Sequence, residues 1–399
     1  AIVPGMPLRM IAFFTFVMLF SAAMHAYLGL RLTAPLGDEY RVAKRAIWAG
    51  LLAHAVFFPL AVGQMRNTGT PWADWLQYVG WTTGGIWSLL LILMLLKDIG
   101  WLGLGLWNQL APASSPLPDD PDRRAFLQTM LNAGVVAATV AIGGAAWVGA
   151  RLRPTIERVR IPIEGLPEAL RGLRIVQVSD IHVGPTIRRE AIERLVATVN
   201  DLKPDLIAVT GDLVDGSVAA LAPHVAPLKD LSAPLGSWFV TGNHEYYSGA
   251  LDWCRHCDEV LGMQVLVDAH RVVEHRGAQI VVAGVADLHA ERLVPQHTSD
   301  PVRAFAGAPA GDLRLLLAHQ PESIRAAADQ GVHLQLSGHT HGGQYFPFTW
   351  LIRLVKRWSR GLHRVGSTWL YVNRGTTYWG PPLRLDSAQE ITVLELDRA

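Results

Sequence analysis

The sequence predicts an α/β domain that is preceded by an all-α membrane segment. Half of its 399 residues are hydrophobic and the mean hydropathy is positive, which is high for a wholly soluble protein. This apolar excess lies almost entirely before residue 150, whereas the rest of the chain has the mixed charged, glycine and proline content of a globular domain. In that later part, short apolar runs alternate with helical or loop segments, as in α/β folds.

Four apolar stretches are candidates for membrane-spanning helices. Residues 10–30 form an almost uninterrupted apolar run of bilayer-spanning length. Residues 47–62 and 75–96 follow, and tryptophans gather at the ends of the latter, as is typical of membrane–water interfaces. Residues 125–150 are apolar and rich in glycine and alanine. We therefore expect a bundle of three membrane helices in residues 1–110, a linker in 111–124, a fourth helix or signal anchor in 125–150 and a globular domain in 151–399.

The distribution of basic residues predicts which way the helices run. The loop between the first two spans holds more basic residues than the next loop, which holds only Arg66, and basic loops stay in the cytoplasm. By this rule the chain after the fourth span lies outside, although the basic residues between 151 and 160 argue against it. The pair Arg123-Arg124, followed by a weakly hydrophobic stretch, resembles a twin-arginine export signal, which carries folded domains outward. The alternative interpretation, an ordinary arginine pair at the cytoplasmic end of a helix, predicts the same orientation. We expect an integral protein of the bacterial inner (plasma) membrane with an extracytoplasmic globular domain.

Composition narrows the classes of partner. The net charge of +1 and the lack of a basic tract give no support for nucleic-acid binding, so we expect no nucleic-acid partner. Only two cysteines occur, Cys254 and Cys257, too few for a structural zinc site or a disulfide framework. We interpret them as partly buried thiols or a local disulfide. No feature of the sequence predicts an oligomeric state.

His25 and His54 lie inside predicted spans, where ionisable side chains are functional candidates. Neither has an acid or a second histidine at helical spacing, so we expect neutral histidines that hydrogen-bond within the bundle. A transporter is an alternative supported only by these histidines and the four spans. The spans lack the paired charges and broken inverted repeats that are typical of transporters.

Six apolar runs after residue 158 predict buried strands. Residues 191–202, between the first two runs, have the spacing of an amphipathic helix, which makes a strand–helix–strand unit. The runs are residues 173–178, 206–210, 238–240, 280–285, 313–317 and 334–336, and residues 391–396 predict a closing strand.

Acidic and histidine side chains follow these strands directly. In open α/β sheets the loops beyond the carboxyl ends of the strands converge on one crevice, so side chains far apart in sequence meet there. Carboxylates and an amide oxygen are hard ligands, while imidazoles suit Zn, Fe or Mn. The pattern predicts a site for two divalent ions about 3.5 to 4 Å apart, with Asp212 as the bridging carboxylate. The residues of the pattern are Asp180, His182, Asp212, Asp215, Asn243, His244, Glu245, His319, His339 and His341.

The order and spacing of these residues resemble the signature of calcineurin-like metallophosphoesterases. The matching blocks are D-x-H at 180–182, G-D-x-x-D at 211–215, G-N-H-E at 242–245, His319 and G-H-T-H at 338–341, with no departure at a ligand. The Gly-Gly-Gln after His341 and Asn373-Arg374-Gly375 are similar to a membrane-associated bacterial branch of that family. The resemblance implies a metallophosphoesterase sandwich, in which two sheets are flanked by helices, and the activity of a phosphoric ester hydrolase.

The resemblance also implies a role for each residue by its position. His244 stays free of metal, faces the scissile phosphate and stabilises or protonates the leaving oxygen, a role that imidazole can fill near neutral pH. Asp215 and Glu245 orient His244 or a ligand histidine. The first ion is held by Asp180, His182, Asp212 and His341, and the second by Asp212, Asn243, His319 and His339.

The reaction implied is hydrolysis of a phosphomonoester, phosphodiester or diphosphate by in-line attack of a metal-bridging hydroxide, without a covalent enzyme intermediate. A site beside a bilayer favours a phospholipid, a lipid-linked diphosphate or an envelope polymer as substrate. Two alternatives stay open. One is a cytoplasmic-facing pyrophosphatase of nucleotide-linked lipids, which membrane topology distinguishes. The other is a catalytically silent membrane scaffold of the same fold, which the intact ligand set disfavours.

Residues 345–363 form an aromatic and basic stretch that has two interpretations. It is either a loop that touches lipid headgroups or an amphipathic surface helix that packs on the domain.

Overall fold

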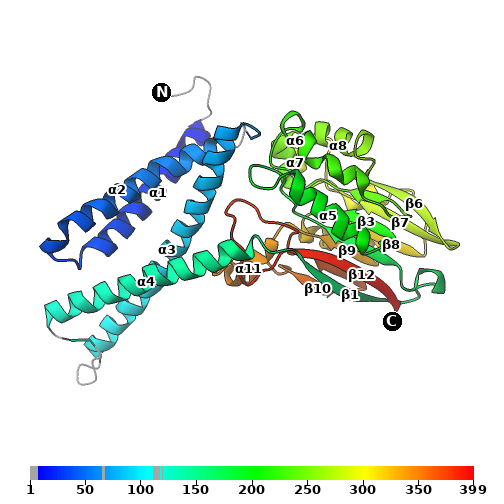
Figure 1. The fold of residues 1–399 in the computed structure, drawn as a ribbon. Coiled ribbons are helices and arrows are strands. Elements are labelled where there is room, and N and C mark those ends of the chain that lie inside the picture. The colour runs from blue at the N-terminus through cyan, green and yellow to red at the C-terminus, as the bar shows by residue number, and fades with distance from the viewer. Residues whose placement is uncertain (1–7, 65–67, 111–116, 119) are drawn as a thin grey trace. The chain divides into compact units, whose positions relative to one another are not determined.

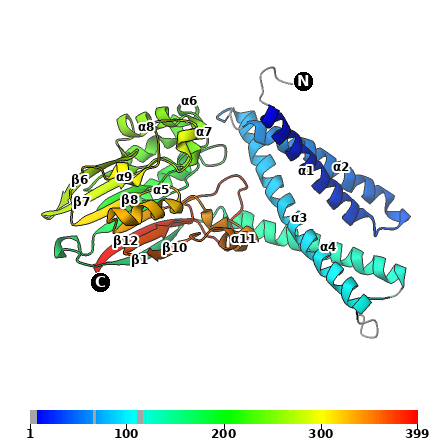
Figure 2. The ribbon, with the colours of Figure 1, turned by 180° about the vertical axis from the view of Figure 1, so that it is seen from behind.

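The computed structural model describes residues 8–64, 68–110, 117–118 and 120–399, so Arg66 and residues 111–116 and 119 of the predicted linker lie outside the described residues. The chain divides into two compact units, drawn from opposite sides in Figure 1 and Figure 2. The first unit comprises Ala1–Gly63 and Val79–Ala145, and the second Gln64–Tyr78 and Ala146–Ala399.

Four N-terminal helices are long and apolar enough to cross a membrane, as the sequence predicts. The third is longer than the predicted span at both ends, because the apolar sequence continues past residue 96 without a proline to stop the helix. The helices are α1 (Leu8–Thr33), α2 (Arg41–Val62), α3 (Pro71–Leu110) and α4 (Pro121–Gly149).

Polar side chains inside the first unit are paired between helices. Nε2 of His25 lies 2.9 Å from Nδ1 of His54, so both histidines are hydrogen-bonded within the bundle as expected. Arg31 forms an ion pair with Asp98 at 2.6 Å, which links α1 to α3 just beyond the predicted spans 10–30 and 75–96. Spacing along one helix cannot reveal such partners, because they come from different helices.

The second unit contains two six-stranded sheets, in the strand orders β1-β12-β2-β3-β4-β5 and β10-β11-β9-β8-β7-β6. Strands β2 to β5 are parallel, and so are β7, β8, β9 and β11. The strands of the first sheet are β1 (Thr155–Ile163), β2 (Arg174–Val178), β3 (Leu206–Val209), β4 (Ser237–Phe239), β5 (Gln264–Val265) and β12 (Glu390–Arg398). Those of the second are β6 (Ala269–His275), β7 (Ala278–Gly284), β8 (Leu313–Leu317), β9 (Leu334–Ser337), β10 (Gly361–Val365) and β11 (Thr368–Val372).

The second unit is a sandwich of four layers, helices, first sheet, second sheet and helices, with an apolar core between each pair of layers. This arrangement confirms the predicted fold. Ile175, Leu315 and Leu336 belong to the core between the sheets. Helices α5, α6 and α8 cover the outer face of the first sheet, where Val196 and Trp253 join its core (Figure 1). Helices α9 and α10 cover the second sheet. The helices are α5 (Arg189–Asp201), α6 (Val218–Val225), α7 (Asn243–Ser248), α8 (Ala250–Glu259), α9 (Pro301–Ala304), α10 (Ile324–Ala327) and α11 (Phe348–Val355).

The predicted strands correspond to the strands at the centres of the sheets. Strands such as β3 are buried along their whole length and read as short apolar runs, because both faces are covered. The strands that the sequence analysis missed are β1, β5, β6, β10 and β11. Four of these carry charged or polar residues on an exposed face or are very short, so they lack an apolar run.

Candidate active site

The loops that follow five strands bring all the predicted site residues to one place. Asp180 and His182 follow β2, while Asp212 and Asp215 follow β3. The segment 243–245 opens α7 after β4, His319 follows β8, and His339 and His341 follow β9. Both sheets therefore contribute, because the carboxyl ends of their parallel strands lie at a common edge.

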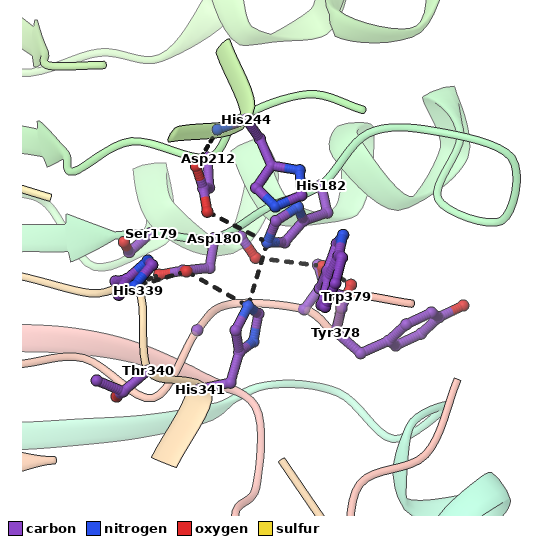
Figure 3. A network of polar contacts seen from close by, with 12 residues as sticks. Ser179, Asp180, His182, Asp212, His244, His339, Thr340, His341, Tyr378 and Trp379 are labelled. Carbon is purple, nitrogen blue, oxygen red and sulfur yellow. Dashed lines mark hydrogen bonds and ion pairs between the residues drawn. The ribbon is translucent and has the colours of Figure 1, made fainter. Parts of the chain in front are cut away.

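One group of possible ligands consists of Asp180, His182 and His341, which point toward one another in Figure 3. Nε2 of His341 lies 3.3 Å from Oδ1 of Asp180 and 3.1 Å from Nε2 of His182. The three side chains are buried. Two imidazole nitrogens at this separation share at most one proton, whereas two lone pairs would coordinate one cation well.

A second group consists of Asp212, His319 and His339. Oδ2 of Asp212 lies 3.0 Å from Nε2 of His319, which in turn lies 3.2 Å from Nδ1 of His339. The same carboxylate oxygen is 3.8 Å from Nε2 of His182 in the first group. Asp212 therefore lies between the two groups, near a histidine of each.

Asn243 adds a further sign that the second group suits a cation. Its Oδ1 atom is buried and has no hydrogen-bond partner among the described residues. A buried carbonyl oxygen without a donor is unfavourable by about 1–3 kcal/mol, and a divalent cation would satisfy it. The donor set of carboxylate, amide and imidazole thus fits a metal centre.

The backbone at the ligands adopts a conformation that non-glycine residues seldom take. Positive φ angles of 49° to 72° occur at Asp180, His182, Asp212, His339 and His341. Each costs on the order of 1–3 kcal/mol and persists only where surrounding contacts impose it. Such contacts join the β2 and β3 loops here, because the amides of Asp180 and His182 donate to the carbonyls of Gly211 and Asp212, each at 3.0 Å.

Glu245 holds the loops that follow β3 and β4 through hydrogen bonds to their backbone amides. Its buried carboxylate accepts hydrogen bonds from the backbone amides of Asp212, Leu213 and Gly242. Burial and the charge of Asp212 raise the pKa of Glu245 to about 8. Gly242 lets the carboxylate of Asp212 lie close to the backbone, since a Cβ at position 242 would be 2.1 Å from Oδ1 of Asp212. Glu245 thus positions the backbone of the β3 and β4 loops, whereas the resemblance implies that it orients His244 or a ligand histidine.

His244 is paired with Asp215 beside the ligand groups. Nδ1 of His244 lies 2.6 Å from Oδ1 of Asp215, and the same oxygen lies 3.3 Å from Nδ1 of His182. Burial lowers the pKa of His244, but the carboxylates of Asp212 and Asp215 outweigh it and raise that pKa to about 9. Burial also raises the pKa of Asp215, but the two imidazoles outweigh it and hold the carboxyl well below its usual range. The pair therefore favours a protonated His244 and an ionised Asp215.

Two residues near the site were missed by the sequence analysis. The ring of Trp379 stands edge-on to His244, with centroids 5.2 Å apart (Figure 3). Arg384 is buried and its Nη2 lies 2.8 Å from Nδ1 of His341. Burial and this guanidinium lower the pKa of His341, which keeps its imidazole in the neutral form that binds metals. Both come from the long loop after β11, where no strand signal marks them, although Asn373-Arg374-Gly375 lies at its start.

The two cysteines lie in α8, away from the ligand groups, and both are free thiols. Burial raises the pKa of Cys254 to about 12, and burial also raises that of Cys257. Of the two interpretations given above, the structure supports partly buried thiols.

Comparison with known proteins agrees with this geometry. The family model described as calcineurin-like phosphoesterase matches residues 173–343. A zebrafish (Danio rerio) "transmembrane protein with metallophosphoesterase domain" is 37% identical over 82% of this chain and 74% of its own length. An "uncharacterized metallophosphoesterase" of Helicobacter pylori is 32% identical over 69% of this chain and 73% of its own. The "uncharacterized metallophosphoesterase YkuE" of Bacillus subtilis is 32% identical over 69% and 97%. The chain belongs to the calcineurin-like phosphoesterase family and is a metallophosphoesterase.

Proposed function

We propose that this protein is a membrane-anchored phosphoesterase with a binuclear metal centre, and that it hydrolyses a phosphomonoester, phosphodiester or diphosphate outside the bacterial inner membrane. The observation that carries the proposal is the position of Asp212, whose carboxylate lies within 3.8 Å of a histidine from each ligand group. Metal centres with one shared carboxylate are suited to in-line displacement at phosphorus.

The residues that would hold the ions are those that the two groups bring together. Asp180, His182 and His341 would hold one, His319, His339 and Asn243 the other, and Asp212 both. When bound there, Mn, Zn or Fe ions supply Lewis acidity toward a phosphoryl oxygen and toward water. Four histidines, in contact as two pairs beside buried carboxylates, suit these metals better than calcium or magnesium.

The chain's own contribution to the reaction is a positioned proton. His244 lies close enough to His182 and Asp212 to form a third group of possible ligands, but the two proposed ions do not need it. Asp215 holds its Nδ1 atom, so Nε2 would donate to a leaving oxygen. The carboxylates that raise its pKa keep that proton in place at neutral pH. Trp379 packs against the same ring and limits its rotation and its access to water.

The test is turnover of a chromogenic phosphodiester and its monoester by the full chain in detergent, after chelation and readdition of Mn²⁺, Zn²⁺ or Fe²⁺. Asp212→Asn and His244→Ala are compared with His289→Ala, an exposed histidine outside the site. Metal-dependent turnover lost in the first two variants and kept in the third supports the proposal. Stoichiometric metal binding without turnover, for any metal, contradicts it and favours the scaffold alternative.

A further inference from the structure

Helix α11 exposes a large apolar face close to the metal ligands. Its eight residues begin seven positions after His341. Thr349 is buried, whereas Leu354 and Val355 are 82% and 76% exposed, and Trp350 and Leu351 are exposed beside them. Four large exposed apolar side chains on two turns of helix form a contiguous apolar patch, and such patches mark interaction sites.

The base of α11 packs against the end of α4. Phe348 contacts an apolar cluster of Ala146, Tyr345 and Leu383, all of which belong to the second unit. The amide of Arg384 donates to the carbonyl of Ala146 at 2.8 Å, which joins the same parts through the backbone. Helix α11 is therefore fixed at the C-terminal end of an apolar helix that is long enough to span a bilayer.

That end of α4 has the side chains of a membrane–water interface. The guanidinium of Arg151 lies 3.3 Å from the ring centroid of Trp147 and donates to the carbonyl of the same residue. Tryptophan at headgroup depth and arginine just beyond it are typical of helix ends in membranes. Phe348 packs one residue away from Trp147, against Ala146, so the base of α11 is at the same level.

Basic side chains border the apolar face. Arg353 is 3.8 Å from Asp386 and half exposed, Lys356 pairs with Glu322 at 2.6 Å, and Arg357 stacks on Trp358. Arg357 has no carboxylate partner among the ion pairs of the described residues, and the ion pair of Arg353 is long. Apolar residues flanked by arginines complement a bilayer whose headgroups carry phosphate.

The segment before α11 also reaches the mouth of the site. The side chain of Gln344 donates to the carbonyl of Trp379 and accepts from its amide, both at 2.9 Å. Trp379 in turn lies against His244. The segment that leads into α11 is thus joined through Trp379 to His244.

We propose that α11 is an interfacial helix: its face of Trp350, Leu351, Leu354 and Val355 enters the surface of a phospholipid bilayer and brings a lipid-borne phosphoester to the metal site. This substrate class rests on the proposed phosphoesterase function. The occupant of the face is the lipid surface, because the last residues of the apolar helix α4, which belong to the same unit, pack against the base of α11 and because arginines border the face.

The contact is tested with full-length protein in liposomes of phosphatidylethanolamine and phosphatidylglycerol. In a Cys254→Ala/Cys257→Ala background, Leu354→Cys carries an environment-sensitive fluorophore, and Val302→Cys on α9 is the control because Val302 is also exposed. We expect a blue-shifted emission and quenching by nitroxide-labelled lipid at position 354 only. Equal quenching at both positions or at neither overturns the contact. A blue shift at 354 that lipid nitroxides do not quench assigns the face to a protein partner and also overturns it.

The substrate class is tested with Leu354→Asp/Val355→Asp against Val302→Asp. On a phosphoester of a long-chain lipid in the same liposomes, we expect kcat/KM of the double variant to fall at least about tenfold, with turnover of the soluble chromogenic ester changed less than about twofold. Equal loss on both substrates, or none on the lipid, overturns lipid presentation by α11. Failure of the wild type on every ester instead contradicts the proposed function, and the fluorescence result still decides the membrane contact.

Discussion

Asp215 holds His244 through a 2.6 Å contact to Nδ1, and this contact favours the protonated form of the imidazole. The carboxylate is largely buried and contacts His182 as well, so it joins His244 to the first ligand group. A substitution of Asp215 can therefore change both the rate and metal binding, so both have to be measured.

Replacing Asp215 by Asn should move the basic limb of the pH–rate profile to lower pH. The carboxylates raise the pKa of His244 to about 9, so losing one charge lowers that pKa and deprotonates the donor earlier as pH rises. We expect kcat at neutral pH to fall roughly 10- to 100-fold, as for other residues that orient a reactive group. The check is kcat against pH, with metal content measured alongside. An unshifted basic limb would argue that His244 does not donate the proton.

Adding a methyl group at Gly375 should disturb His341. A Cβ at this position would lie 2.7 Å from Nδ1 of His341 and 2.9 Å from Nη2 of Arg384, and φ is +87°. We expect Gly375→Ala to lose metal and to melt at a lower temperature. Gly331→Ala is the matched control, because its φ of +64° carries the same backbone strain of about 1–2 kcal/mol with open space around it. Equal metal content in the two variants would falsify the steric argument.

Truncating Arg384 should weaken the site without removing a ligand. Its guanidinium is buried and donates to the carbonyls of His341 and Arg374. Arg384→Met leaves the carbonyl of Arg374 without a donor, at about 1–3 kcal/mol, whereas the carbonyl of His341 keeps its bonds from Ser387 and the amide of Gln344, so the melting temperature should fall by a few degrees. Calorimetry with and without Mn²⁺ measures the change. A melting temperature equal to that of the wild type would show that water replaces the guanidinium.

Chelation should lower the stability of the second unit. Ions that bind only the folded chain stabilise it by about 2.7 kcal/mol at one hundred times Kd. We therefore expect a lower melting temperature in a strong chelator and recovery on adding Mn²⁺ or Zn²⁺. The matched control is Asp212→Asn, in which chelator and metal should both have little effect. Identical responses of the two proteins would place the stabilising ion elsewhere.

The cysteines should resist alkylation while the protein is folded. Burial raises the pKa of Cys254 to about 12 and also raises the pKa of Cys257 well above its usual range, and thiolates are the reactive form. Mass spectrometry after iodoacetamide treatment at neutral pH should find both thiols unmodified, with full labelling in denaturant. Rapid labelling of Cys257 in the native protein would contradict its burial in the core of the first sheet.

The sequence predicted the buried strands and the ligands that follow them better than it predicted the exposed strands and the loops. Val209 and Leu317 end short apolar runs, and a polar ligand must follow such a run when a buried strand reaches the sheet edge. By contrast, β1 carries the charged residues Glu157 and Arg158, so its sequence lacks the apolar run that predicts a strand. The positions of Trp379 and Arg384 depend on the path of a loop after β11, which no local pattern specifies. Partners such as His25 and His54 come from separate helices and need three-dimensional packing to be paired.

The parallel pairing of β1 with β12 has a consequence for the order of folding. Every predicted ligand precedes β12 along the chain, yet Glu390 at the start of β12 holds Arg374 and Tyr371, and its amide donates to Gly375. A nascent chain that already carries all the ligands therefore lacks the strand that fastens the loop around His341. We therefore expect the ligands around His341 to become ordered only after β12 has been translated.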